Sequence, residues 1–348
     1  PALNPSEKGV TFTPIVLRPE QLKAINETVK EFKTGNRMLW NAKMRFGKTL
    51  SALEVVRQMK FDKTIIITHR PVVDKGWYED FEKIFYHEED YIYGSRSNKY
   101  TVADLIESGK HFVYFASIQN LRGSEQVGGK YAKNDDIYNA KWDCVIVDEA
   151  HEGTTTPLGE DVIRALISDD TKLLALSGTP FNILGNYDTN VYTWDYIMEQ
   201  RCKAEWDNEH FGDSNPYDEL PKMNIFVYDL GKLTNNKYVD IQDKAFKFNE
   251  FFRVWTGDAE KDYRPVPEGK RIGDFVHEDD VRSFLNLITT ESADTKYPFA
   301  TDEFRKEFKH TFWMLPGVKE AKALSSVLKT HPVFMHYQVV NLAGEGDE

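Results

Sequence analysis

Short, continuous apolar runs in the first half of the chain constrain the fold more than any other feature. They alternate with segments in which apolar residues recur at helical spacing, such as Leu22, Ile25 and Val29. Unbroken apolar strands are expected where helices cover both faces of a parallel sheet, and alternating strands and helices predict a doubly wound α/β domain. The predicted strands are residues 38–41, 64–68, 111–116, 144–148 and 172–177.

The regular alternation ends near residue 182. From residue 182 to residue 308 the chain is rich in Tyr, Trp, Asp and Asn, with one predicted strand at 223–228 and a predicted helix at 281–288. We interpret residues 182–308 as an insertion packed on a first domain that spans residues 1–181.

The last part of the chain shows a further strand–helix–strand pattern. Residues 311–315 and 337–342 are predicted strands on either side of a predicted helix at 318–329. One such unit is too small to bury a core of its own. Residues 309–348 are therefore predicted to begin a second domain that is truncated here, and the first residue, Pro1, suggests that the chain lies inside a larger protein.

Charge and cysteine content limit the possible classes of protein. The net charge is −12 and the isoelectric point about 5.3, which argues against coating of nucleic acid through bulk charge but not against a local contact. Cys144 and Cys202 are far apart and lack CxxC spacing, so no zinc site is predicted and a reducing cytoplasm is expected. No apolar run approaches the roughly 20 residues of a membrane span.

A phosphate-binding loop is predicted between the first strand and the next helix. Residues 42–49 read Ala-Lys-Met-Arg-Phe-Gly-Lys-Thr, the pattern GxxxxGK[ST] with Ala in place of the first Gly. Gly47 permits close approach of the backbone, Lys48 reaches the β- and γ-phosphates, and the Thr49 hydroxyl ligates Mg²⁺. The alternative is a chance strand–turn–helix that contains Gly-Lys-Thr.

Two acidic residues leave the end of the strand at 144–148. Asp148 is suited to hold a metal ion, and Glu149 is suited to orient or deprotonate an attacking water. The alternative is a strand that simply ends in charged loop residues. That alternative is weaker here because a phosphate loop precedes the pair, with strands between them.

At this point the chain resembles superfamily 2 helicases and translocases. Asp-Glu-Ala-His at 148–151 matches the DEAH box, and Leu-Arg-Pro-Glu-Gln at 17–21 resembles the upstream glutamine motif. Thr-His-Arg-Pro at 68–71 resembles motif Ia, Ser-Ile-Gln at 117–119 a further strand-contact motif, and Ser-Gly-Thr-Pro at 177–180 motif III.

The details are most similar to the motor subunits of type I and type III restriction enzymes. The resemblance covers roughly residues 15–182, and also 311–348 as the start of a second RecA-like domain. It implies a RecA-like P-loop fold, with ATP and Mg²⁺ as cofactors.

The resemblance also implies a role for each motif residue. The implied ATP-binding residues are Arg18, Gln21, Arg45, Phe46, Gly47, Lys48 and Thr49, with Gln21 on adenine. The implied catalytic residues are Lys48, Asp148, Glu149 and His151, and the implied magnesium ligands are Thr49 and Asp148. The implied nucleic-acid contacts are Arg70, Pro71, Ser117 and Gln119, and the implied coupling residues are Ser177, Gly178 and Thr179.

Several of these residues have plainer interpretations. Gln21 is also compatible with a surface helix, and His151 with a loop histidine that has a structural partner. Arg70 and Ser117 are also compatible with capping strands or solvating loops.

We expect the motor portion of an ATP-dependent DNA translocase or helicase from a restriction or other DNA-processing system. An RNA helicase and a nucleotide-gated interaction module without motor activity are the alternatives. DNA is the expected track, and nuclease, methyltransferase or specificity domains are the expected partners. Because the family carries its arginine finger in the second RecA-like domain, we expect this chain to hydrolyse ATP slowly by itself.

Overall fold

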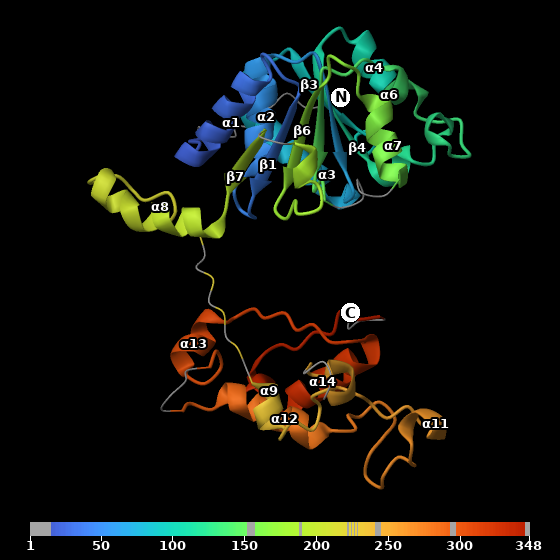
Figure 1. Cartoon of the computed structure of the whole chain (residues 1–348), viewed down its shortest axis with the longest axis vertical. Coiled ribbons are helices and arrows are strands. Elements are labelled where there is room, and N and C mark those ends of the chain that lie inside the picture. The colour runs from blue at the N-terminus through green and yellow to red at the C-terminus, as the bar shows by residue number, and fades with distance from the viewer. Residues whose placement is uncertain are drawn as a thin grey trace. The chain divides into compact units, whose positions relative to one another are not determined.

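The chain folds into two compact units, which are described separately. The structure is a computed structural model and describes residues 15–151, 157–187, 190–220, 223, 225, 227, 229–240, 245–292 and 297–344. The units are Pro1–Lys222 and Met223–Glu348 (Figure 1). This division differs from the expected boundaries after residues 181 and 308, because residues 190–220 extend the first unit.

A seven-stranded sheet forms the centre of the first unit. Its strand order is β3-β4-β2-β5-β6-β1-β7, and all neighbouring strands are parallel. The strands are β1 (Arg37–Ala42), β2 (Lys63–Thr68), β3 (Tyr91–Ser95), β4 (His111–Ser117), β5 (Cys144–Asp148), β6 (Lys172–Ser177) and β7 (Val191–Trp194). The five predicted strands are confirmed, whereas the edge strands β3 and β7 were not predicted.

Helices cover both faces of this sheet (Figure 1). The first face packs against α1 (Pro19–Glu31), α2 (Lys48–Met59), α3 (Asp74–Ile84) and, at its margin, α8 (Tyr196–Glu209). The second face packs against α4 (Val102–Glu107), α5 (Ile118–Leu121), α6 (Asp135–Asn139) and α7 (Pro157–Leu166). The helix predicted from the spacing of Leu22, Ile25 and Val29 is confirmed, since all three lie in α1 and Ile25 is fully buried.

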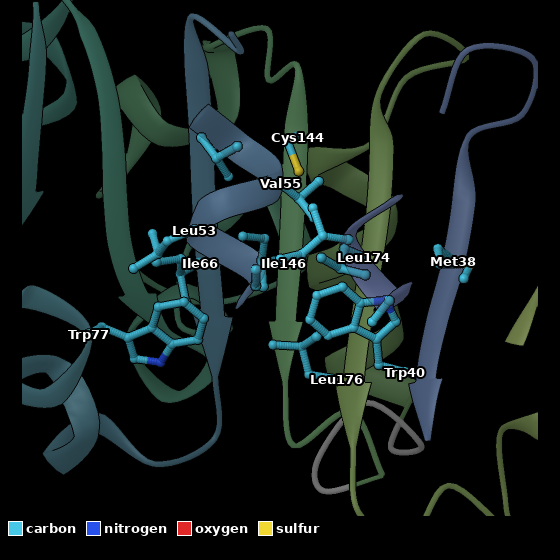
Figure 2. Packing of buried hydrophobic residues seen from close by; sticks show 14 of the residues in the cluster. Met38, Trp40, Leu53, Val55, Ile66, Trp77, Cys144, Ile146, Leu174 and Leu176 are labelled. Carbon is cyan, nitrogen blue, oxygen red and sulfur yellow. The ribbon is translucent and has the colours of Figure 1, made fainter. Parts of the chain in front are cut away.

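Strand residues divide between the two faces by alternation. In β5, Cys144 and Ile146 join the first core, whereas Val145 and Val147 join the second. Figure 2 shows the first core, in which Trp40 of β1 and Trp77 of α3 are buried. Full burial of one aliphatic side chain in such a core stabilises the fold by about 2 kcal/mol. Unbroken apolar strands therefore reflect a sheet that is covered on both sides.

The second unit is mainly helical in its described part. Its helices are α9 (Leu230–Leu233), α10 (Phe248–Phe251), α11 (Ala259–Asp262), α12 (Glu278–Thr289), α13 (Asp302–Glu307) and α14 (Val318–Thr330). Apolar residues of α10, α12 and α14 share one core. The helices predicted at 281–288 and 318–329 are confirmed.

The two strands predicted at 311–315 and 337–342 are wrong. The structure gives both segments irregular backbone, and Phe312, Met314 and Leu342 are largely exposed. A strand needs a neighbour for its backbone N–H and C=O groups, and the described residues of this unit supply only isolated bridges. The assignment of 309–348 to a second RecA-like domain stays a prediction.

The strand predicted at 223–228 lies partly outside the described residues. Residues 224, 226 and 228 are not described, and the described residues 223, 225 and 227 are not in a strand.

In the parts of the chain that the structure describes, no helix combines the length and the apolar character needed to cross a membrane.

Candidate active site

The predicted site residues gather at the carboxyl edge of the sheet. In the register of the strands, Thr68 at the end of β2 pairs with Ser117 of β4 and with Asp148 of β5. Asn41 of β1 pairs with Ser177 of β6. Since all of these strands are parallel, the loops that follow them leave the same edge, where ligands bind in open α/β sheets.

The phosphate loop joins β1 to α2 and leaves the start of α2 open. Gly47 has φ +87° and Arg45 has φ +65°, so the loop contains two left-handed residues on either side of Phe46. Among the described residues no side chain caps α2, and its first turn carries no acidic residue. The first N–H groups of a helix lack intrahelical partners, and together with the left-handed turns they form a concave site for an anion.

Lys48 occupies a partly buried position beside both acids. Its Nζ donates to the carbonyl oxygens of Ala42, at 2.7 Å, and Lys43, at 3.4 Å. Burial lowers the pKa of Lys48, and the charges of Glu149 and Asp148 act in the opposite direction. The two acids thus compensate the positive charge of the Lys48 ammonium only in part, and an anion bound in the loop would stabilise it further.

Asp148 and Glu149 extend from the end of β5. Burial raises the pKa of Asp148, while a hydrogen bond from Trp77 and the charge of Lys48 oppose that rise. Glu149 has φ +51°, a conformation that is uncommon for a residue with a side chain. Its backbone N–H donates to Asp148 Oδ1 at 3.0 Å. The left-handed turn redirects the chain directly after the last strand residue.

Trp77 contacts this site from α3, a role that no sequence motif predicted. Its Nε1 donates to Asp148 Oδ2 at 3.2 Å, and its ring is buried in the first core. Trp77 is thus a core residue whose side chain also orients a carboxylate. Only the packing of α3 against β5 reveals this second role.

The glutamine motif holds the phosphate loop in the present structure. Gln21 Nε2 donates to the Phe46 carbonyl oxygen at 2.9 Å, and Gln21 Oε1 accepts from the backbone N–H of Arg18 at 2.8 Å. The Arg18 guanidinium donates to the carbonyl oxygens of Arg45 and Phe46, at 3.1 Å and 2.8 Å. Gln21 is buried rather than a surface helix residue. Its contact with adenine stays a prediction.

A hydrogen bond joins the DEAH segment to the predicted coupling motif. His151 Nδ1 lies 2.8 Å from Ser177 Oγ and 3.5 Å from Glu149 Oε2. Ser177 Oγ also accepts from the Thr179 backbone N–H at 3.1 Å. His151 therefore connects the acid that faces the loop with the turn at 177–179, which includes Gly178.

The predicted nucleic-acid residues form a neighbouring group at the ends of β2 and β4. Gln119 Nε2 donates to the His69 carbonyl oxygen at 2.6 Å, and Ser117 caps α5 by accepting from Asn120. Arg70 and Pro71 are exposed beside them. Within the described residues, His69 Nδ1 and Gln119 Oε1 are buried without a hydrogen-bond partner.

A cavity of about 410 Å³ adjoins this group. Pro71 and Ser117 line it, together with Arg96 after β3 and Lys133 before α6. Asp74 and Asp136 also line the cavity, so its two cations are balanced by two carboxylates. The nucleic-acid contacts of Arg70, Pro71, Ser117 and Gln119 stay a prediction.

The residues present fit a magnesium nucleotide. The open helix start and Lys48 suit a triphosphate, and the Thr49 hydroxyl and Asp148 carboxylate suit Mg²⁺. In the described part of the chain, no three His, Cys, Asp or Glu residues group around a possible metal position.

The chain resembles known proteins in its first unit. Residues 14–182 match the family model described as the res subunit of type III restriction enzymes. The match supports the predicted resemblance to restriction-enzyme helicases over these residues. The first unit has a RecA-like α/β fold, built on the parallel sheet described above.

One curated relative matches beyond these residues. It is a Mycoplasma pneumoniae protein provisionally named as the C-terminus of a type II restriction enzyme and methyltransferase. The two sequences are 24% identical over an alignment that is 396 positions long. The alignment covers 95% of this chain and 52% of the relative, so the chain spans about half the length of that protein.

Solved structures also resemble about half of this chain. The SWI2/SNF2 ATPase core of Sulfolobus solfataricus in complex with dsDNA is 20% identical, with 50% of this chain and 34% of that chain covered and a TM-score of 0.39. The UvsW helicase of bacteriophage T4 is 15% identical, with 52% and 61% covered and a TM-score of 0.39. At TM-scores this low, neither structure supports an argument about the function of this chain.

Proposed function

We propose that the chain is the ATP-binding motor portion of an ATP-dependent DNA translocase or helicase from a restriction or related DNA-processing enzyme. The observation that carries the proposal is the position of Lys48, which is held in the phosphate loop within electrostatic range of both Asp148 and Glu149. A binding site alone needs no acid beside the phosphates, whereas hydrolysis needs a group that positions water.

The geometry supports a separate chemical role for each of the site residues. The N–H groups at the start of α2 and the Lys48 ammonium bind the phosphates. Thr49 and Asp148 would hold Mg²⁺, which when bound neutralises charge on the phosphate oxygens. Glu149 orients the attacking water and accepts its proton.

The link from His151 to Ser177 supports coupling between hydrolysis and movement. A change at Glu149 reaches the turn at 177–179 through one histidine ring, because His151 lies near both residues. The nucleic-acid track is proposed along Arg70, Pro71, Ser117 and Gln119, beside the cavity that Arg96 and Lys133 also line. Slow hydrolysis by this chain alone stays a prediction.

Two substitutions test the assignment of the ATP site. Lys48→Ala removes the ammonium and should abolish binding of Mg-ATP, measured by isothermal titration calorimetry. Glu149→Gln keeps the size of the side chain but removes the base, so binding should persist while turnover falls by a factor on the order of a hundred or more. Unchanged binding in the first variant, or unchanged turnover in the second, would refute the assignment.

The track is tested by stimulation of ATP turnover. Duplex DNA, single-stranded DNA and RNA are compared at one salt concentration, because phosphate contacts depend strongly on salt. Stimulation by DNA and not by RNA supports the proposal. Stimulation by RNA alone would replace it with an RNA helicase, and absence of stimulation by all three would favour a nucleotide-gated interaction module.

A further inference from the structure

The phosphate loop has a side-chain support that lies outside the matched helicase motifs. Lys43, the first loop residue after β1, places its Nζ 2.7 Å from both carboxylate oxygens of Glu199 in α8. The backbone N–H of Lys43 donates to the Trp194 carbonyl oxygen at the end of β7, at 3.0 Å. Glu199 is fully buried, and Lys43 is its ion-pair partner.

The buried Glu199 carboxylate needs a partner at a fixed position to compensate its charge. Removing a charge from water is unfavourable unless a partner compensates it closely, so Glu199 holds Lys43 in one place. The Lys48 Nζ in turn donates to the Lys43 carbonyl oxygen at 3.4 Å, so Lys43 lies directly beside the phosphate-binding lysine. Glu199 therefore fixes a second cation beside the phosphate-binding lysine.

The same segment of chain also supports the glutamine motif. The Tyr217 hydroxyl donates to Glu20 Oε2 at 2.8 Å, and the Tyr192 hydroxyl donates to the Glu20 carbonyl oxygen at 2.8 Å. Glu20 in turn lies 2.5 Å from the Arg18 guanidinium, which donates to the carbonyl oxygens of the phosphate loop. Residues 191–220 thus contact both the phosphate loop and the glutamine motif.

We propose that residues 191–220 form a clamp that positions the nucleotide site, with Glu199 and Tyr217 as positioning residues. The proposal rests on the proposed ATP site and goes beyond it, because the helicase match ends at residue 182. Glu199 holds the Lys43 side chain in one position and so aligns the loop from one side. Tyr217 acts through Glu20 and Arg18 from the other side.

The clamp predicts a defect in nucleotide affinity without a general loss of folding. Glu199→Gln keeps the size of the side chain and removes its charge, so the Kd for Mg-ATP should rise about tenfold, as for other residues that orient a binding group. Lys43→Met should have a similar effect. The double variant should be no weaker than either single variant, because both changes break the same ion pair.

A matched control separates positioning from stability. Glu54→Gln breaks the 2.7 Å ion pair with Arg57 in the middle of α2, in the same unit but away from the loop. Its Kd for Mg-ATP should equal that of the wild type. Tyr217→Phe removes one hydroxyl group only, and it should raise the KM for ATP while leaving kcat within about twofold.

The full chain is titrated with Mg-ATP by calorimetry, and the folding of each variant is checked by thermal denaturation. A rise in Kd for Glu199→Gln alone, with Glu54→Gln unchanged, supports the clamp. Equal Kd values in the wild type and Glu199→Gln, tighter binding by Glu199→Gln, or equal weakening in both variants would overturn it. If the wild type itself fails to bind Mg-ATP, the proposed function fails first.

Discussion

Gly47 at the end of the phosphate loop gives a prediction that the structure makes quantitative. Its φ of +87° lies in the left-handed region, and a Cβ atom at this position would lie 2.4 Å from Gln21 Nε2. Gly47→Ala therefore adds backbone strain and also displaces an amide that is hydrogen-bonded to the Phe46 carbonyl oxygen.

The two effects have separable magnitudes. A left-handed conformation costs an L-residue about 1 kcal/mol relative to glycine. Displacement of the Gln21 amide forfeits one buried hydrogen bond, which contributes about 1 kcal/mol. Gly47→Ala should thus lower the free energy of unfolding by about 2 kcal/mol, and it should weaken Mg-ATP binding because the loop is distorted.

A double-mutant cycle separates the two effects. Urea unfolding is measured for the wild type, Gly47→Ala, Gln21→Ala and the double variant. In the Gln21→Ala background the added methyl group meets open space, so Gly47→Ala should cost only the backbone part. The expected coupling free energy is about 1 kcal/mol.

Two results would refute this account of Gly47. A total loss below about 0.5 kcal/mol would show that the loop relaxes freely around the new methyl group. Strict additivity in the cycle would show that the Gln21 amide does not restrict this position.

Three further predictions concern the acid side of the site. Trp77→Phe keeps a ring but removes the hydrogen bond to Asp148, so the free energy of unfolding, measured with urea, should fall by about 1–2 kcal/mol; no loss would contradict the contact. Because burial raises the pKa of Asp148 above 3.8, the folded chain holds that proton more tightly than the unfolded chain does. Urea titrations at several pH values should therefore show the ligand-free wild type losing stability relative to Asp148→Asn as the pH rises above 3.8; a difference between the two that does not change with pH would count against the buried charge. Ser177→Ala removes the partner of His151, so DNA-stimulated ATP turnover should fall several-fold while the Kd for Mg-ATP stays within about twofold; full stimulation would exclude the coupling role.

Local sequence patterns predicted the parts of the fold that depend on local chemistry. The apolar runs at 64–68 and 144–148 became central strands because helices cover both of their faces. The pattern at 42–49 predicted a strand, a loop and a helix start, and the structure has all three. Edge strand β7 was missed because it has only four residues and lies in a stretch without regular alternation of strands and helices.

The remaining errors and omissions depend on partners that are distant in sequence. Residues 311–315 have strand-like composition, but composition cannot supply the neighbouring strand that a sheet requires. Lys43 and Glu199 are 156 residues apart, and Trp77 and Asp148 are 71 apart. Neither pair belongs to a spaced motif, so only tertiary packing brings their side chains together.

The strand register has a consequence for how this protein can vary. Asp148 and Ser117 are the last residues of their strands and both pair with Thr68, so their direction depends on parity along each strand. Insertion of a single residue within β5 would turn the carboxylate toward the opposite side of the sheet. A change in length is consequently more tolerable in the connections between the elements than within a strand that carries a site residue.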